Sequence, residues 1–312
     1  MPSIKFVRTW WPRKPGRRRC KLAESAFELY GIFGHPLAHT LSPVMQEAGL
    51  KAAGRKGFYL PFDLTPADYR KVLASLPRLI LDGFNVTVPY KEWTARSIKH
   101  RTPEAQAVGA VNTVYRRGRQ WVGTNTDVYG FCRALAKDGH FRTQGKKIAV
   151  LGAGGAARAV VYGLAREKAA CILILNRHPE RARKIVRDFQ RLFPKTKLQA
   201  SALVPGTAKA ALNEADLVVN STSVGMKKGD AKLLQAVWLP RAGTKPKLFY
   251  DLIYRPAETV FLRQARLKGH RTLNGMSMLL YQGAKAFECW TGKKAPETLM
   301  RRALTEALQT HG

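Results

Sequence analysis

Lys147-Ile-Ala-Val-Leu-Gly-Ala-Gly-Gly-Ala-Ala-Arg158 is the stretch of this 312-residue chain that decides its fold. Ile148 to Leu151 is a short apolar run typical of a buried parallel strand, and the alanine-rich residues 156–165 predict a helix. Between them, Gly152-x-Gly154-x-x-Ala157 matches the phosphate-binding turn of dinucleotide-binding folds, in which glycines permit the tight turn and let a pyrophosphate reach the backbone. Glycine turns also join strands to helices without a ligand. Because strand, turn and helix follow in the required order, we predict a dinucleotide site.

Size and cysteine usage indicate a protein of about two domains with free thiols. The chain is 45% hydrophobic, which is enough for two cores. Its apolar runs fall short of the ~18 residues of a membrane span, and its N-terminus lacks the apolar region of a secretory signal. Four scattered cysteines without CxxC spacing argue against a zinc site and a disulfide framework, so we expect no metal and a reducing, cytoplasmic location. They are Cys20, Cys132, Cys171 and Cys289.

The charge balance is strongly basic, with 54 Lys and Arg against 21 Asp and Glu and a net charge of +33. Residues 1–26 hold eight of the basic residues and one Glu, and they predict a disordered arm rather than a domain. Such a charge attracts anions and can bind nucleic acid non-specifically. Outside the arm the basic residues form no pattern interleaved with aromatic residues, so we interpret them as a solvated basic surface.

Strands alternating with helices predict an α/β fold with mainly parallel sheets. In the first part we expect Ser42 as N-cap of a helix that Pro43 begins, and a hairpin from Asn112 to Val122 that turns at Arg117-Gly118. The expected strands there are 29–33, 58–62 and 83–88, with a helix at 66–76. In the second part the expected strands are 148–151, 171–175, 197–200, 217–221 and 248–253. The expected helices are 127–137, 156–168, 179–192, 257–268, 275–290 and one from Pro296.

The residues after the second strand of the nucleotide unit favour NADP over NAD. Folds that prefer NAD place an acidic residue at this strand end, where it binds the ribose 2′-hydroxyl, whereas a nearby Arg suits a 2′-phosphate. This chain has Asn176-Arg-His-Pro-Glu-Arg181 there, with no acid at the strand end itself. Arg177 and Arg181 lie four apart and could clamp a phosphate through their planar guanidinium groups. They could also be ordinary solvated arginines.

Two candidate catalytic residues lie in the first part of the chain. Lys91 follows Asn85-Val-Thr-Val-Pro-Tyr90, just past the carboxyl end of a buried strand, where ligands bind in open α/β sheets. Asp127 opens the helix after Gly123-Thr-Asn-Thr126. Taken alone, Lys91 is typical of a surface lysine and Asp127 of a helix cap. The uncharged Thr40, Ser42, Thr87 and Asn112 suit a polyhydroxylated ligand or ordinary turns. Spacing alone does not bring these residues together.

Several motifs in register resemble the shikimate dehydrogenase family over residues 29–292. They are His39-Thr-Leu-Ser-Pro43, Asn85-Val-Thr-Val-Pro-Tyr-Lys91, Gly109-Ala-Val-Asn-Thr113, Asn125-Thr-Asp127, the Gly152 turn, Asn176-Arg177, Asn220-Ser-Thr-Ser-Val-Gly225, Asp251-Leu-Ile-Tyr254 and Gly275 to Gly292. The resemblance implies NADPH-dependent, reversible reduction of 3-dehydroshikimate to shikimate on the route to chorismate and the aromatic amino acids. It also implies an N-terminal substrate domain and a Rossmann-type NADP-binding domain facing across a cleft, with C-terminal helices that return to the substrate domain.

Site residues and domain bounds also come from the resemblance. It implies a substrate domain at 27–126 and 275–312, an NADP-binding domain at 127–274, and Lys91 and Asp127 as the catalytic pair. The substrate would contact Thr40, Ser42, Thr87, Lys91, Asn112, Asp127, Tyr254 and Gln282. The cofactor would contact Gly152, Ala153, Gly154, Gly155, Ala156, Asn176, Arg177, His178, Arg181, Leu252 and Gly275. In the reduction, an ammonium at Lys91 would donate a proton as negative charge builds on the ketone oxygen.

Two departures from the family pattern leave alternatives open. Thr40 stands where Ser is common in the family, so the substrate range could include quinate, with broader use of NAD. His178 stands where Thr is common, and its ring could reach the phosphate. Because histidine changes charge near pH 6.5, NADPH affinity should weaken as the pH rises through neutrality. A more distant alternative is a basic nucleic-acid-binding protein that retains the fold. A homodimer is compatible with the sequence.

Overall fold

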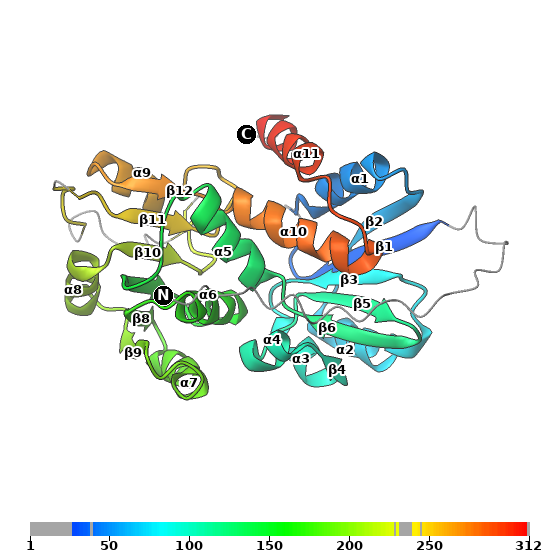
Figure 1. The fold of residues 1–312 in the computed structure, drawn as a ribbon, viewed down its shortest axis with the longest axis horizontal. Coiled ribbons are helices and arrows are strands. Elements are labelled where there is room, and N and C mark those ends of the chain that lie inside the picture. Colours follow the sequence, from blue (N-terminus) through cyan, green and yellow to red (C-terminus); the bar gives the residue numbers. More distant parts are fainter. Residues whose placement is uncertain (1–26, 38–39, 228, 231–238, 244, 311–312) are drawn as a thin grey trace, which may run out of the picture.

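The computed structural model describes residues 27–37, 40–227, 229–230, 239–243 and 245–310. Within these residues the chain forms two units, each built on a sheet of six strands, which lie side by side along the long axis of the molecule (Figure 1). The expected basic arm and Cys20 lie outside the described residues. Over the described ranges, no helix is both long enough and apolar enough to cross a membrane.

The first sheet is mixed, because a hairpin is inserted into an otherwise parallel arrangement. The order of its strands is β2 (Gly57–Asp63), β1 (Glu28–Gly34), β3 (Gly83–Val86), β5 (Thr113–Arg117), β6 (Gln120–Thr124) and β4 (His100–Arg101). β1 pairs in parallel with β2 and β3, whereas β5 runs antiparallel to both of its neighbours. The predicted hairpin is therefore confirmed. It brings the amino end of β5 beside the carboxyl ends of β3 and β6.

The second sheet is entirely parallel. The order of its strands is β12 (Arg271–Leu273), β11 (Leu248–Asp251), β10 (Leu217–Asn220), β7 (Lys147–Leu151), β8 (Cys171–Asn176) and β9 (Lys197–Ala202). Numbered from β7, this is the doubly wound order of dinucleotide-binding folds, in which ligands bind where the order reverses. That reversal lies between β7 and β10, which pair in parallel from Leu217 opposite Ile148 to Asn220 opposite Leu151.

Helices cover both faces of the second sheet, as the alternation of side chains along β7 requires. Ile148 and Val150 belong to the apolar cluster that includes residues of α6 and α7, whereas Ala149 and Leu151 pack with residues of α8 and α9. The bounds of the helices are α5 (Asp127–Lys137), α6 (Gly155–Arg166), α7 (Pro179–Gln190), α8 (Pro205–Glu214) and α9 (Val260–Leu267). In the first unit they are α1 (Ser42–Ala52), α2 (Pro66–Ala74), α3 (Lys91–Ser97) and α4 (Pro103–Val108), with a 3₁₀ turn at Leu76–Arg78.

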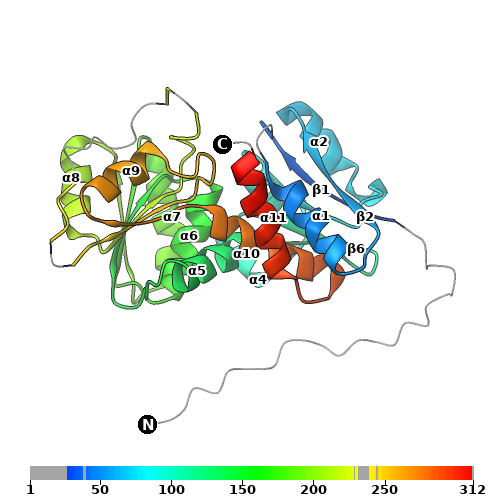
Figure 2. The same cartoon turned by 90° about the horizontal axis from the view of Figure 1, so that it is seen from above.

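The C-terminal helices return to the first unit. α10 (Met276–Thr291) packs on both α5 and α1, and α11 (Glu297–Thr310) packs on α1 (Figure 2). Near the end of α10, the Trp290 ring stacks on Tyr30 of β1 with 4.9 Å between ring centroids. One buried apolar cluster therefore runs from the first sheet through α10 and α5 to the second sheet. This packing fixes how the two units face each other.

Most expected elements are present, and their ends differ from the expected ones by a few residues. Ser42 is a correction: it is the first residue of α1, and Leu41 occupies the N-cap position without a side-chain cap. Thr126 likewise occupies the cap position of α5, so Asp127 is its first helical residue rather than its cap. Both side chains are thereby free to serve a purpose other than capping. The third strand ends at Val86 rather than Val88, because the chain turns there, with Tyr90 N–H donating to Thr87 O at 2.9 Å.

Candidate active site

The edge of the first sheet where β3 and β6 end brings Lys91, Asn112 and Asp127 together. β3 leads through a turn, closed by Tyr90 N–H donating to Thr87 O at 2.9 Å, into α3, whose first residue is Lys91. Asn112 precedes β5, and its backbone N–H donates to Thr124 O at the end of β6 at 3.2 Å. Asp127 then opens α5. The antiparallel hairpin, rather than sequence spacing, creates this meeting point.

Lys91 and Asp127 form an ion pair that is largely buried. Lys91 Nζ lies 2.6 Å from Asp127 Oδ2, with side-chain exposures of 14% and 5%. A charged pair is held out of water at a cost, and that cost is offset only where the geometry is good and further hydrogen bonds are made. Asp127 Oδ1 accepts one such bond from Asn112 Nδ2 at 2.8 Å. An ammonium held in this way can donate a proton to an oxygen placed beside it.

The side chain of Asn112 has a fixed orientation. Its Oδ1 accepts from the backbone N–H of Thr126 at 2.7 Å, which is a donor only, so Nδ2 must face Asp127. Nδ2 also lies 3.3 Å from Gln282 Oε1, on α10. The structure thus gathers four of the predicted substrate residues, from α3, the start of β5, α5 and α10, around one point.

Thr40, Ser42 and Tyr254 form a second group of predicted substrate residues. Thr40 Oγ1 accepts from the Ser42 backbone N–H at 3.4 Å. Tyr254, from the loop after β11 in the second unit, hydrogen-bonds to the Thr40 side chain and to the Leu41 backbone, and burial raises the pKa of its hydroxyl. Tyr254 therefore stays neutral and joins the second unit to the loop of the first unit that precedes α1.

A buried chain of hydrogen bonds connects the two groups. Ser42 bonds to the hydroxyl of Tyr59 on β2, and Tyr59 donates to Asn85 Oδ1 at 2.7 Å. Asn85 Nδ2 donates to Thr113 Oγ1 at 2.9 Å, and Thr113 lies 3.1 Å from Asn112 Oδ1. Because these groups are buried and paired, the network holds one arrangement. Thr87 follows the end of β3, and its backbone N–H donates to Phe33 O at 2.8 Å.

The glycine turn has the geometry that a pyrophosphate needs. Gly152 has φ of 109°, and a Cβ there would lie 2.7 Å from Ser221 Oγ, so only glycine fits. A Cβ at Gly154 would meet nothing within 4 Å, which leaves its backbone open to a ligand. Ala153 precedes it, and Gly155 and Ala156 begin α6 with unpaired N–H groups and the positive end of the helix dipole. This turn fits a dinucleotide phosphate.

Asn176, Arg177, His178 and Arg181 lie next to that turn. Gly152 N–H donates to Leu175 O at 2.8 Å, which places the end of β8 against the glycine turn. Asn176 Nδ2 donates to His178 O at 3.0 Å, and this fixes the connection into α7. The side chains of Arg177, His178 and Arg181 are exposed, so their cationic groups are available to a phosphate.

Leu252 and Gly275 pack against each other at the end of β11. A Cβ at Gly275 would lie 1.9 Å from Leu252 O, so glycine is required there. The neighbouring Asp251 is buried, and it accepts hydrogen bonds from Thr259 Oγ1 at 2.6 Å, Asn220 Nδ2 at 2.9 Å and the Ile253 N–H at 3.1 Å. Burial raises the pKa of Asp251 to about 6 despite these donors.

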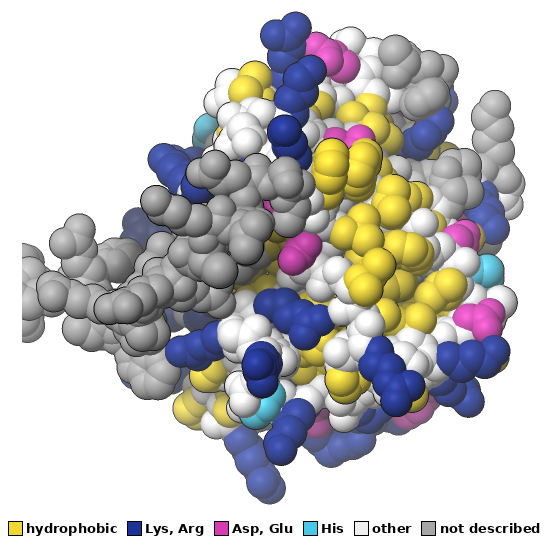
Figure 3. All heavy atoms as spheres, turned by 90° about the vertical axis from the view of Figure 1, so that its right-hand side faces the viewer, with side chains coloured by type: hydrophobic (Ala, Val, Ile, Leu, Met, Phe, Trp, Pro, Cys, Tyr) yellow, Lys and Arg dark blue, Asp and Glu magenta, His cyan; other side chains and the backbone are white. Residues whose placement is uncertain are grey.

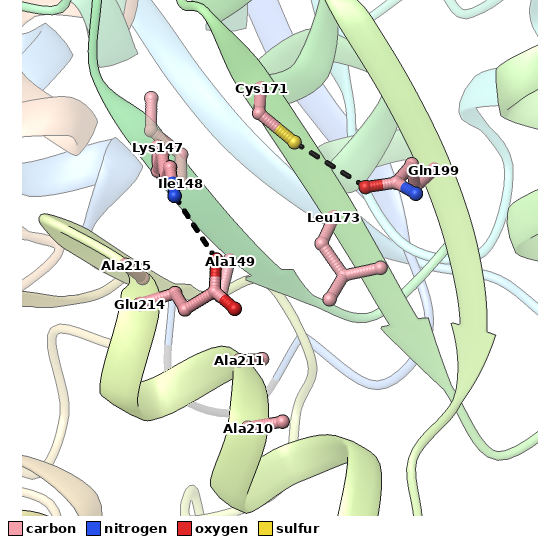
Figure 4. A pocket seen from close by; sticks show the side chains of 10 residues that line it. All are labelled: Lys147, Ile148, Ala149, Cys171, Leu173, Gln199, Ala210, Ala211, Glu214 and Ala215. Atoms are coloured by element: carbon pink, nitrogen blue, oxygen red, sulfur yellow. Dashed lines mark hydrogen bonds and ion pairs between the residues drawn. The ribbon is translucent and has the colours of Figure 1, made fainter.

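The glycine turn and Lys91 lie side by side at the point where α6 begins. A Cβ built on Gly155 would lie 3.4 Å from Lys91 Cβ. A cavity of about 150 Å³ in the second unit lies at the opposite edge of the sheet, where β7 and β8 begin at Lys147 and Cys171 (Figure 4). It contains none of the predicted site residues. The candidate active site is therefore the edge where Lys91 and the glycine turn meet.

Comparison with known proteins gives matches to one family along most of the chain. Residues 32–114 match the family profile of the shikimate dehydrogenase substrate binding domain, residues 134–254 that of shikimate / quinate 5-dehydrogenase, and residues 275–305 that of the shikimate 5'-dehydrogenase C-terminal domain. The chain is 43% identical to a shikimate dehydrogenase (NADP(+)) of Geobacter metallireducens, over 89% of this chain and 96% of that protein. The chain belongs to the shikimate dehydrogenase family.

Solved structures of other proteins extend the match. The crystal structure of shikimate 5-dehydrogenase from Thermus thermophilus in complex with NADP(H) and shikimate has a TM-score of 0.77 and 36% identity, covering 90% of this chain and 100% of that one. Quinate dehydrogenase from Corynebacterium glutamicum in complex with NAD has a TM-score of 0.79 and 27% identity, covering 90% and 99%. Both neighbours share the two-unit α/β architecture predicted from the sequence, with a substrate domain and a Rossmann domain. The family fold is thus confirmed for this shikimate dehydrogenase homologue.

Sequence reasoning missed the residues that connect the predicted ones. Tyr59 and Thr113 are buried at 1% and 0% exposure and carry the hydrogen-bond chain, yet each reads as an ordinary strand residue. Arg158 closes the quoted glycine stretch and is 7% exposed, although no role was predicted for it. The available signal was a charged residue in the first turn of an otherwise apolar, alanine-rich helix, because arginine is rarely buried unless it is paired.

Proposed function

We propose that this chain catalyses the reversible, NADPH-dependent reduction of 3-dehydroshikimate to shikimate. Family membership supports the reaction class. The observation that carries the proposal is the Lys91–Asp127 pair at 2.6 Å, beside the end of the glycine turn, where a Cβ at Gly155 would lie 3.4 Å from Lys91 Cβ. The test is the appearance of NADPH when the purified protein meets shikimate and NADP⁺. Absence of turnover with shikimate and with quinate, each with NADP⁺ and NAD⁺, would refute it.

In the proposed mechanism Lys91 is the proton donor. NADPH, when bound at the glycine turn, supplies the hydride that reduces the ketone carbon. As that carbon gains the hydride its oxygen becomes negative, and the Lys91 ammonium stabilises the charge and transfers a proton, which yields the alcohol. Asp127 and Asn112 hold the ammonium in place. In the oxidation the neutral amine must accept the proton, so shikimate oxidation should accelerate at alkaline pH.

The remaining polar residues orient the substrate in this proposal. Thr40 and Ser42 would bind the substrate carboxylate, with Tyr254 closing over them from the second unit. Thr87, Asn112 and Gln282 would contact the ring hydroxyls. Hydroxyl and amide groups suit a polyhydroxylated ring, because each can both donate and accept hydrogen bonds.

NADP is the proposed cofactor. Gly152, Ala153, Gly154, Gly155 and Ala156 would hold the pyrophosphate, with Leu252 and Gly275 near the nicotinamide end. Arg177 and Arg181, with Asn176 and His178, would bind the 2′-phosphate, for which paired guanidinium groups are suited.

Quinate is the second candidate substrate, favoured by one observation. Thr40 hydrogen-bonds to Tyr254 in the substrate loop, at the position where the family commonly has Ser. Its extra methyl group changes the space available to the substrate. Steady-state rates with shikimate and quinate, each with NADP⁺ and NAD⁺, distinguish the two: a specificity constant for quinate with NAD⁺ above that for shikimate with NADP⁺ would favour a quinate/shikimate dehydrogenase.

We propose residues 27–126 with 275–312 as the substrate domain and residues 127–274 as the NADP-binding domain. We also propose a cytoplasmic location, on the usage of free cysteines.

The basic surface is proposed as solvated rather than as a nucleic-acid site. A salt-dependent shift of duplex DNA that survives deletion of residues 1–26, in a protein without dehydrogenase activity, would favour the nucleic-acid alternative.

A homodimer is proposed through the β2 edge of the first sheet. Among the described strands, β2 pairs with β1 alone, so its other edge carries unpaired backbone groups. Phe58 and Leu60 on β2 are 51% and 40% exposed, and Phe27 stacks on Phe58 at 5.6 Å. Figure 3 shows hydrophobic side chains gathered on this end of the molecule. A second copy could pair its β2 about a twofold axis. Sedimentation velocity tests this, and a monomer would contradict it.

A further inference from the structure

Arg158 reaches from the cofactor-binding unit into the substrate-binding unit. It lies in the first turn of α6, just after the glycine turn, and is 7% exposed. Its Nε donates to Val108 O, at the end of α4 in the first unit. Its Nη1 pairs with Asp188 Oδ2, on α7 of the second unit, at 2.8 Å. One buried side chain therefore joins a helix end of one unit to two helices of the other.

The guanidinium of Arg158 is enclosed on its remaining sides. Gly109 caps α4 with φ of 69°, and a Cβ there would lie 2.9 Å from Arg158 Nη2. The Phe189 ring centroid lies 5.0 Å from the guanidinium carbon. The carbonyl at a helix C-terminus carries partial negative charge, so Val108 O suits a cation. A planar fork with two fixed acceptors admits one orientation, and a lysine could not reproduce it.

The segment that Arg158 holds also carries the catalytic groups. Val108 and Gly109 lead directly into Ala110-Val111-Asn112. Val111 N–H donates to Lys91 O at 2.9 Å, and Asn125 Nδ2 donates to Ala110 O at 2.9 Å. At its other end, Arg158 lies three residues after Gly155, where a Cβ would lie 3.4 Å from Lys91 Cβ. The side chain thus connects the NADP-binding turn to the segment that holds Lys91 and Asn112.

We propose that Arg158 is a positioning residue that sets the distance between the NADP-binding turn and the Lys91–Asn112 segment. The inference rests on the proposed function, because it assigns Arg158 to hydride transfer between two ligands held by different units. Hydride transfer needs the reacting atoms about 3–3.5 Å apart, and a misplacement of about 1 Å can cost on the order of a hundredfold in rate. Each ligand contacts its own unit, so loss of Arg158 should leave each binding step intact.

The experiment compares turnover with binding in Arg158→Met. We expect kcat for shikimate oxidation to fall by about ten- to a hundredfold, while the dissociation constants for shikimate alone and NADP⁺ alone, measured by calorimetry, stay within about threefold. The isotope effect with shikimate deuterated at the oxidised carbon should rise, because hydride transfer becomes more rate-limiting. Asp188→Asn keeps the hydrogen bond from Arg158 to Val108 O and weakens the ion pair. It should lower kcat less than Arg158→Met does, again with both dissociation constants unchanged.

Arg166→Met is the matched control. Arg166 also lies on α6 and also reaches α4, where it pairs with Glu104 at 2.5 Å, but its side chain is 40% exposed and lies at the far end of the helix. We expect kcat of this variant to stay within about threefold of wild type, since exposed pairs contribute little.

Three results would overturn the proposal. The first is unchanged kcat in Arg158→Met, and the second is loss of either ligand affinity in step with kcat, which indicates a merely structural role. If Arg158→Met does not fold, the same two criteria apply to Asp188→Asn. An unchanged kcat in Asp188→Asn is then the third result that would overturn the proposal. An inactive wild type would refute the proposed function and this inference with it, whereas an active wild type with an equally active Arg158→Met refutes this inference alone.

Discussion

Lys91 Nζ and Asp127 Oδ2 lie 2.6 Å apart although 36 residues separate them in the chain. Their meeting depends on two strand ends of the first sheet, and Asn112 completes it by donating to the other carboxylate oxygen at 2.8 Å. A lysine at a strand end is ordinarily solvated, so the carboxylate and the amide are what distinguish this one. The three side chains therefore form one unit, and changes to them should not be additive.

Lys91→Ala tests the proton donor. We expect kcat to fall by about a thousandfold in both directions, because general acid–base groups typically contribute 10²–10⁴-fold. KM for shikimate should change by less than about threefold, since the interaction strengthens mainly in the transition state. Steady-state kinetics in both directions measure this. Asp127 left unpaired also costs stability, so melting temperatures should accompany the rates.

Lys71→Ala is the control for Lys91→Ala, since Lys71 is a 79% exposed lysine of the same unit that pairs with Asp68 at 3.0 Å. It should leave both kinetic constants unchanged. The pH dependence is the sharper readout: shikimate oxidation by the wild type should rise toward alkaline pH, and an alkaline optimum retained in Lys91→Ala would contradict the assignment.

Arg177→Ala and Arg181→Ala test cofactor choice. Each should raise KM for NADP⁺ by about ten- to a hundredfold, because a hydrogen bond to a charged group contributes about 1.5–3 kcal/mol. KM for NAD⁺ should stay the same, since NAD lacks the 2′-phosphate. Arg183→Ala is the control: Arg183 is exposed on α7 too, but two positions after Arg181 it faces another side of the helix. Equal losses for NADP⁺ and NAD⁺ would remove these arginines from phosphate binding.

The fold could be predicted because its signals are local. The apolar run before Gly152, the glycines and the alanines after them each specify one backbone conformation, and the structure has β7, the turn and α6 in that order. The hairpin turning at Gly118 is local in the same sense. The helices α3, α4 and α8 were not predicted; α3 and α4 have only seven and six residues, and segments that short carry little periodicity.

The site was less accessible to sequence reasoning, because its contacts cross between elements. Lys91 and Asp127 each had an ordinary interpretation, and only the resemblance joined them. Tyr59 had no signal of its own, because a tyrosine in a strand looks the same whether it links a site or faces solvent. For Arg158 the sequence offered only a charge among apolar and alanine residues. Their burial and their partners appear only when β2, α4 and α7 are placed in space.

His178→Ala tests whether histidine binds the cofactor phosphate. His178 occupies the N-cap position of α7, is exposed, and has Nδ1 3.9 Å from Glu180 Oε1. The wild-type dissociation constant for NADPH should increase as pH rises through neutrality, because only the imidazolium attracts a phosphate. The variant should remove that slope. Titration of NADPH fluorescence between pH 5.5 and 8 measures both, and a flat wild-type curve rules the role out.

Asp251 should give the stability of the protein a distinct pH dependence. Burial raises its pKa in the folded protein from 3.8 to about 6. Between pH 3.8 and about 6, Asp251 therefore carries its proton in the folded protein and has lost it in the unfolded chain. The resulting stabilisation is fully present below about pH 4 and is lost as pH rises through about 6. Relative to Asp251→Asn, which cannot titrate, the wild type should lose on the order of 3 kcal/mol of unfolding free energy over this interval.

Urea unfolding of both proteins between pH 4 and 7.5 measures this difference. Asp230→Asn provides a control of opposite sign, because the backbone N–H groups of Lys227 and Gly225 lower the pKa of the exposed Asp230. The stabilisation that Asp230 provides is present above the pKa of this group in the unfolded chain, and it is lost as the pH falls through the lower pKa of the folded protein. If the gap between wild type and Asp251→Asn is constant from pH 4 to 6, or widens in favour of the wild type as pH rises, Asp251 does not hold its proton in the folded protein.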